Sequence, residues 1–153
     1  MSRVLRSFAE GGFNLEISMM DGTSVLARLP YPSPLPGRFA VASEVATMDF
    51  VRAHGIPTSQ ILGYATSENP VGSEYILIEK PSGGPIGDEW FDISEQQRLP
   101  ILYDIVEFGS TLFSIQVPNS GSIYYTHDLG PDTSKVDITG VDGQFCVGPY
   151  AGL

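Results

Sequence analysis

Residues 13–30 read FNLEISMMDGTSVLARLP, and this stretch determines the order of the first elements. Apolar and polar residues alternate before and after Asp21-Gly22, as they do in strands with one buried face. Asp and Gly both tolerate the positive φ values that a tight hairpin turn requires. The stretch therefore predicts two antiparallel strands, over residues 13–17 and 24–29, joined at Asp21-Gly22.

The flanking sequence predicts more strands and one helix. Further strands are expected at residues 4–8, 59–64 and 74–79. The proline-rich residues 30–36 form a loop. Apolar residues then recur with a helical period over residues 40–54, and Gly55 followed by Pro57 ends the helix. The order β-β-β-α-β-β predicts a five-stranded antiparallel sheet with one packed helix.

A second, longer helix is expected to begin after Ser94. Ser94 and Gln97 have the spacing of a capping box. Pro100 either lies in the first turn of this helix or kinks it. Its apolar residues cover about half of the circumference or more, so the helix is expected to be buried on most sides. They are Leu99, Leu102, Ile105, Val106, Leu112 and Phe113, flanked by Ile101, Phe108 and Ile115. From Pro118 onward we expect turns and short strands, with a hairpin at Asp142-Gly143.

Composition narrows the classes of function. The 153 residues include 18 acids and 8 bases, which give a net charge of −10. This charge repels phosphate and argues against a nucleic-acid-binding surface. A single cysteine excludes a disulfide within the chain, and together with only two histidines it argues against a metal site. No apolar run approaches the roughly 18–20 residues of a membrane helix, so no membrane segment is expected.

Two features of the first third suggest chemistry. The pair Gly11-Gly12 lets backbone amides approach a phosphate, although a tight hairpin turn is the more ordinary explanation of a lone Gly-Gly. Glu44 shares a helical stripe with Val41 and Met48, which should face the sheet. A carboxylate there must be paired or lie at the solvent edge, because an isolated buried charge is costly. The strand cation nearest to it in a plausible topology is Arg28.

Several blocks of sequence carry a resemblance to a known family. These blocks are AEGGFN (9–14), VLARLP (25–30), ASEVATM (42–48) and GSEYILIEK (72–80), followed by GSIYY (121–125) and FCVGP (145–149). In this order they resemble the fungal aminoglycoside-phosphotransferase-like family, which includes proteins named for altered inheritance of mitochondria. The fold implied is the small lobe of a protein-kinase-like protein.

The resemblance implies roles for individual residues. Gly11, Gly12 and Asn14 would belong to the loop that covers the phosphates of a nucleotide. Arg28 would occupy the position of the strand-three cation, and Glu44 would be its partner on the helix. Arginine here departs from the kinase lysine, and its guanidinium does not place a phosphate as an ammonium does.

The resemblance also implies a hinge and a cofactor. Residues 78–81, with Glu79 and Lys80 at their centre, would be the hinge whose backbone binds the adenine. The cofactors implied are ATP and Mg²⁺. Binding to this chain alone is expected to be weak or absent, because half of the surface that encloses a nucleotide is missing.

The catalytic half of the family pattern is absent from this sequence. Kinase-like transfer needs a catalytic Asp, an Asn about five residues on, and a second metal-binding Asp. Here Asp128 follows His127 directly, and the position five residues past Asp128 is Thr133. We therefore assign no catalytic residue and expect the chain alone to be inactive. It would be a fragment, a truncated gene product or a partial gene sequence.

The resulting prediction is an α+β fold in two parts. Residues 1–83 would be a kinase-like N-terminal lobe with its hinge, and residues 84–153 the incomplete beginning of a helical C-terminal lobe. The function implied is the nucleotide-binding portion of a phosphotransferase-like protein. The alternative is a noncatalytic binding or regulatory remnant. Self-association through residues 99–115 is expected, and the location would be the cytoplasm or the mitochondrion.

Overall fold

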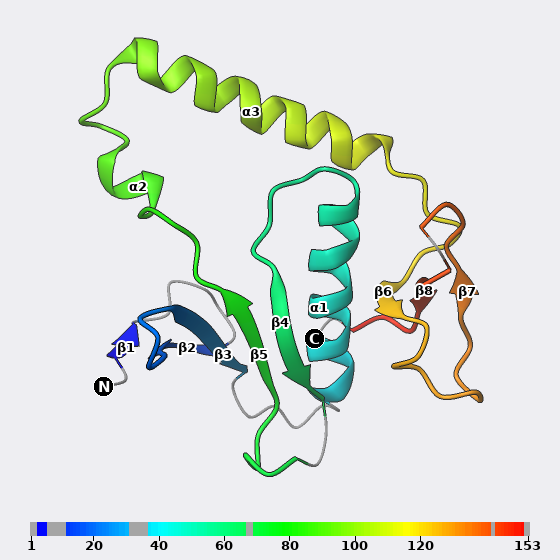
Figure 1. Ribbon diagram of the computed structural model, residues 1–153. Helices are drawn as coiled ribbons and strands as arrows, with labels where there is room; N and C mark the ends of the chain where they lie inside the picture. Colours follow the sequence, from blue (N-terminus) through cyan, green and yellow to red (C-terminus); the bar gives the residue numbers. More distant parts are fainter. Residues whose placement is uncertain (1–2, 6–11, 31–36, 67–68, 142, 152–153) are drawn as a thin grey trace.

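Two antiparallel sheets lie on either side of helix α1, and a second long helix runs across one end of both (Figure 1). The computed structural model describes residues 3–5, 12–30, 37–66, 69–141 and 143–151. The strands are β1 (Arg3–Leu5), β2 (Gly12–Ser18), β3 (Ser24–Pro30), β4 (Ile61–Ala65), β5 (Tyr75–Glu79), β6 (Ser122–Tyr125), β7 (Val136–Asp137) and β8 (Phe145–Gly148). The helices are α1 (Gly37–Ala53), α2 (Ile86–Glu89) and α3 (Glu95–Ser114). The predicted α+β class is confirmed.

The large sheet contains five strands in the order β1-β2-β3-β5-β4, and every neighbouring pair is antiparallel. This confirms the predicted five-stranded sheet. The turn between β2 and β3 forms at Asp21-Gly22, where Gly22 has a φ of +88°. The Asp21 carboxylate accepts hydrogen bonds from both the backbone amide and the hydroxyl of Thr23, which fix the turn. Pro30 of the predicted proline-rich loop ends β3. Residues 31–36 of that loop, residues 6–8 of the first predicted strand, and Asp142 of the predicted hairpin lie outside the described residues.

The small sheet has the order β6-β8-β7 and is built from the tail that was expected to hold only turns and short strands. Gly121 and Gly148 allow its first two strands to approach each other. A Cβ on Gly121 would lie 2.3 Å from the carbonyl oxygen of Gly148, and a Cβ on Gly148 would lie 2.6 Å from Leu129. A side chain at position 121 would therefore require the backbone of β8 to shift, and one at position 148 would require the side chains of Leu129 and Tyr124 to move.

Helix α1 is buried on two sides rather than one. Toward the large sheet, Val41 and Val45 pack with Ile76. Toward the small sheet, α1 contributes the fully buried Ala46 and Phe50. The second buried side arises because the small sheet lies on the face of α1 opposite the large sheet. The cores therefore join residues from both sides of the predicted boundary at residue 83, and α1 is common to both.

Helix α3 begins as predicted but is far less covered than its composition led us to expect. The capping box at Ser94 is present, with the hydroxyl accepting from the Gln97 amide. Pro100 is the sixth residue of the helix, beyond its first turn. No residue of α3 is buried, so the expectation that it is covered on most sides is wrong for the described residues. The reason is that nothing in the described chain packs over its outer face. None of the described helices has both the length and the apolar composition needed to cross a membrane.

Candidate functional site

One row of side chains crosses the large sheet on the face that α1 covers. The strand register pairs Asn14 with Arg28, Arg28 with Ile76, and Ile76 with Tyr64. Residues directly opposite one another on neighbouring strands present their side chains on the same face. Ile76 packs against Val41 of α1, so this row faces the helix. Asn14 and Arg28, predicted from separate sequence blocks, are therefore neighbours.

The predicted ion pair between Arg28 and Glu44 is present. The guanidinium of Arg28 on β3 lies 2.6 Å from the carboxylate of Glu44 on α1, and both side chains are 31% exposed. Burial raises the pKa of Glu44, and the Arg28 guanidinium lowers it by less, so the pKa stays above the ordinary glutamate value. The pair thus consists of a permanently charged arginine and a glutamate whose ionised form is disfavoured by burial.

Replacing Arg28 is expected to cost stability in a pH-dependent way. A carboxyl pKa that is raised on folding removes stability as the pH rises through it, and Arg28→Gln should raise the pKa of Glu44 further. We expect Arg28→Gln to lower the free energy of unfolding by about 1 kcal/mol at neutral pH. The loss should shrink as the pH falls and Glu44 becomes protonated. Urea denaturation at several pH values measures it. In a Glu44→Gln background the pH dependence of this loss should vanish, and its persistence there would contradict the assignment.

Two of the predicted hinge residues, Glu79 and Lys80, form contacts within the large sheet or at its end. The backbone amide of Glu79 donates to the carbonyl of Gln60 at 2.9 Å, so this amide is not available to a nucleotide base. The ammonium of Lys80 lies 2.6 Å from the carboxylate of Glu16 on β2. Lys80 thus ties the end of β5 to the neighbouring part of the large sheet. A role for Glu79 and Lys80 in binding adenine stays a prediction.

The predicted glycine loop is described only in part. Gly12 begins β2 and pairs with Pro30 in the register. Gly11 lies outside the described residues. The backbone placement of Gly12 puts the end of the loop two residues from Asn14, on the strand next to Arg28. A phosphate-covering role for Gly11 and Gly12 therefore also stays a prediction.

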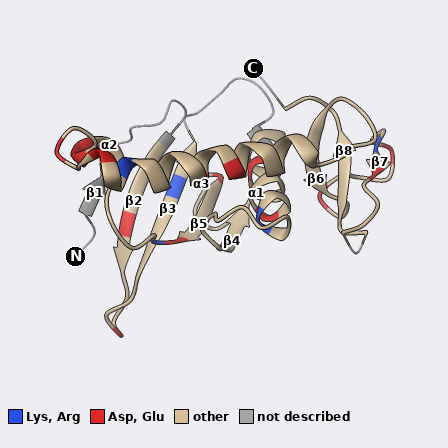
Figure 2. Cartoon of the chain, turned by 90° about the horizontal axis from the view of Figure 1, so that it is seen from above, with Lys and Arg blue, Asp and Glu red and all other residues tan. Residues whose placement is uncertain are grey.

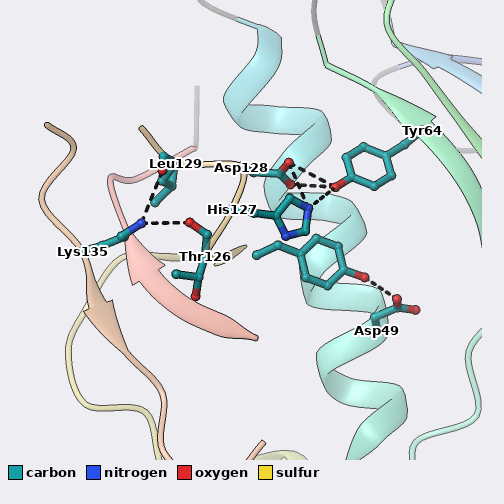
Figure 3. Close-up of polar contacts among 8 residues, drawn as sticks. Asp49, Tyr64, Thr126, His127, Asp128, Leu129 and Lys135 are labelled. Atoms are coloured by element: carbon teal, nitrogen blue, oxygen red, sulfur yellow. Dashed lines mark hydrogen bonds and ion pairs between the residues drawn. The ribbon is translucent and has the colours of Figure 1, made fainter. Parts of the chain in front are cut away.

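A cluster of aromatic and acidic side chains joins the two sheets beside α1; we call it the tyrosine cluster, and it comprises Asp49, Tyr64, Tyr125, His127 and Asp128 (Figure 3). The hydroxyl of Tyr64 donates to the Asp128 carboxylate at 2.9 Å and lies 3.3 Å from the His127 ring nitrogen. The hydroxyl of Tyr125 donates to Asp49 on α1. The Tyr125 ring stacks between those of Tyr64 and His127, with centroids 6.2 and 5.2 Å away.

The electrostatics of the tyrosine cluster favour hydrogen bonding over acid–base chemistry. Burial raises the pKa of both tyrosines far above the ordinary value, and the hydrogen bonds to Asp128 and Asp49 raise it further. Both phenols therefore stay protonated and act as donors at neutral pH. The sequence singled out His127 and Asp128 only as a poor match to a catalytic motif. Their actual contacts with Tyr64 could not be inferred from spacing, because Tyr64 lies more than sixty residues away.

Elsewhere, the described residues offer little that could hold a ligand or a metal. They contain no group of three or more His, Cys, Asp and Glu side chains arranged for a metal ion. A hollow of about 390 Å³ lies where α1 meets the small sheet, lined by Asp49, Arg52, Ala53, Val141, Gln144 and Phe145. None of the predicted nucleotide-site residues lines it.

Comparison with curated proteins finds fungal relatives. The chain is 40% identical over 129 residues to a subtelomeric hrmA-associated cluster protein of Aspergillus fumigatus. The aligned region covers 82% of this chain and 25% of that protein. It is 30% identical over 120 residues to altered inheritance of mitochondria protein 9, mitochondrial, of Saccharomyces cerevisiae, covering 72% of this chain and 19% of that protein. The protein of the same name in Yarrowia lipolytica is 28% identical over 130 residues.

These matches support one part of the resemblance, namely the relation to altered-inheritance proteins. The relatives include proteins of the altered-inheritance type, as the sequence blocks indicated. The chain spans about a quarter or less of the length of these relatives. No protein-family model matches the chain. No solved structure matches it either.

Proposed function

We propose that this chain is the nucleotide-binding portion of an aminoglycoside-phosphotransferase-like, kinase-like protein. The observation that carries the proposal is the ion pair between Arg28 on the third strand and Glu44 on the following helix. In kinase-like small lobes a strand-three cation held by a helix carboxylate contacts the phosphates of ATP. The five-stranded antiparallel sheet and the place of Asn14 beside Arg28 support it.

Within this proposal each predicted residue keeps a role. Arg28 would contact the phosphates, and Glu44 would hold the guanidinium in place. Gly11, Gly12 and Asn14 would cover the phosphates, and the chain around Glu79 and Lys80 would border the adenine. ATP and Mg²⁺ are the proposed cofactors. Their chemistry would be the transfer of the terminal phosphoryl group, for which this chain supplies binding and orientation only.

Nucleotide binding is expected to be weak and to depend on Arg28. Because the proposed site comprises small-lobe residues alone, we expect ATP to bind with a dissociation constant on the order of high micromolar or worse. Arg28→Gln should weaken it further, since the guanidinium is the proposed phosphate contact. Ligand-observed NMR with ATP measures both. Arg98→Gln, which changes an equal charge on α3, is the matched control. Equal binding by the Arg28 and Arg98 variants would contradict the proposed site.

Catalysis by the chain alone is not expected. We predict that the 153-residue chain turns over ATP no faster than a heat-denatured control, with alcohol or amine acceptors present. Positioning of Mg²⁺ and the nucleophile accounts for most of phosphoryl-transfer catalysis, and the residues that would do so are not found in this sequence. The Asp128 carboxylate instead accepts the hydroxyl of Tyr64. Magnesium-dependent turnover that disappears in Asp128→Asn would overturn this assignment.

A second candidate function is a noncatalytic binding module. The outer face of α3 favours it, because large apolar side chains there are exposed and acidic residues gather around α2 and the start of α3 (Figure 2). Such a surface is typical of a protein interface. We include self-association through α3 in the proposal. A chain that binds no ATP yet associates through α3 would favour the binding module over the nucleotide-binding portion.

The proposal extends to a mitochondrial location. Relatives from two yeasts carry the word mitochondrial in their names. The cytoplasm is the alternative. Fluorescence microscopy of the tagged full-length protein in its fungal host decides between the two.

A further inference from the structure

Helix α1 is attached on two of its sides. Glu44 forms the ion pair with Arg28 of the large sheet, and Asp49 accepts a hydrogen bond from Tyr125 of the small sheet. Five residues of α-helix correspond to about 140° of rotation and about 7.5 Å along the axis. Apolar packing on both sides already restrains the helix. Two polar contacts on different sides, separated along the axis, add directional constraints on its rotation and its position.

The ion pair does not hold α1 in place by itself. Both side chains of the pair are nearly one-third exposed, and ion pairs with such exposure contribute little to stability. Packing anchors the helix on both sides, since Ala46 and Phe50 are buried against the small sheet, and Val41 and Val45 against Ile76 of the large sheet. The place of Glu44 therefore depends in part on packing that lies on the far side of its own helix.

The small sheet also bonds directly to the large sheet. Asp128, in the turn that follows β6, accepts from the hydroxyl of Tyr64 on β4 (Figure 3). The rings of Tyr64 and Tyr125 also stack. Tyr64 belongs to the same row of the large sheet as Arg28, with Ile76 between them. One row thus carries the ion pair at one position and the bond to the small sheet at another.

We infer that the small sheet positions the candidate nucleotide site: Tyr125 bonds to α1, Asp128 just after β6 bonds to Tyr64 of the large sheet, and together these bonds hold α1 at the rotation at which Glu44 meets Arg28. Tyr125 and Asp128 are then positioning residues, and neither contacts the nucleotide. The inference rests on the proposed function only for its consequence for ATP; the coupling between the small sheet and the ion pair is a property of the chain.

The coupling can be measured by the response of Glu44 to its partner. Because Arg28 lowers the pKa of Glu44, Arg28→Gln should raise that pKa in the otherwise unsubstituted chain. In a Tyr125→Phe background, which removes the bond to Asp49 and keeps the ring, we expect this rise to be lost. NMR titration of the labelled Glu44 carboxyl measures its pKa in the unsubstituted chain, in Arg28→Gln, in Tyr125→Phe and in the double variant. The first two give the rise in the unsubstituted chain, and the last two give the rise in the Tyr125→Phe background.

Controls separate positioning from loss of stability. Tyr103→Phe removes a hydroxyl from an exposed tyrosine on α3. In this background Arg28→Gln should still raise the pKa of Glu44. A role of Tyr125 in stability alone would lower the urea midpoint and leave the rise unchanged, and that result would overturn the inference. Tyr64→Phe breaks the second bond and provides the same test should Tyr125→Phe fail to fold.

The outcome does not depend on ATP. Loss of the rise supports positioning by the small sheet, whether or not the chain binds nucleotide. Absence of ATP binding together with loss of the rise would refute the proposed function and leave the positioning intact. An equal rise in the Tyr125→Phe and unsubstituted backgrounds would refute the positioning, whatever the affinity for ATP.

Discussion

Replacing Val106 and Phe113 with glutamate is expected to convert an associating chain into a monomer. These side chains on α3 are 69% and 94% exposed, and Leu99 and Leu102 lie on the same face of the helix. Each large apolar side chain left in water forgoes roughly 1.5–3 kcal/mol of burial, which a second copy of the helix can recover. The net charge of −10 opposes association without covering the apolar face.

Size-exclusion chromatography with light scattering at micromolar concentrations measures this association. Ser120→Glu with Ser134→Glu is the matched control, because it adds the same two charges at exposed polar positions outside α3. The control variant should still associate, only slightly less than the unsubstituted chain. A stable monomer formed by the unsubstituted chain would sink the prediction.

Phe50→Ala is expected to destabilise both sheets together. Phe50 is 2% exposed and packs edge-to-face on Phe145 of β8, with ring centroids 5.4 Å apart. Truncating a buried phenylalanine costs about 3–5 kcal/mol, a large part of the roughly 5–15 kcal/mol that stabilises a domain. Because α1 carries the core of both sheets, we expect β5 and β8 to lose protection in parallel, although Phe50 packs mainly toward the small sheet.

Amide hydrogen exchange, resolved by strand, measures this loss. Phe91→Ala is the matched control, since Phe91 is 86% exposed and its truncation should change stability by less than about 0.5 kcal/mol. Loss of protection confined to β6 and β8 would show instead that the small sheet unfolds as a separate unit.

Most of the local structure could be predicted from the sequence. The turn at Asp21-Gly22 and the capping box at Ser94 depend on residues within three positions of each other, so their chemistry is visible in the sequence. Alternation predicted the strands of the large sheet, because each has one face against a core. The Arg28–Glu44 pair could be predicted because a carboxylate on the buried stripe of α1 required a partner.

The same reasoning could not place the small sheet or the cover of α3. A helical period shows that a residue avoids water, and it does not show which element excludes the water. Ala42, Ala46 and Phe50 fit the apolar composition of α1, yet nothing local indicates that a second sheet covers them. Likewise, the apolar residues of α3 predicted burial, and in the described chain that face is exposed.

The sequence by itself indicated the strands of the large sheet, the two long helices and the residues of the candidate ion pair. Periodicity and turn chemistry mark the elements, and a carboxylate on a buried stripe requires a partner. Only the tertiary structure decided that α1 lies between two sheets and that Tyr64 meets Asp128. The physical reason is sequence separation. A hydrogen bond between residues 64 positions apart leaves no periodic signal in the sequence. Taken alone, the polar groups of Tyr64 and Asp128 could equally be hydrated by solvent. The contacts that hold Glu44 against Arg28 belong to this second group.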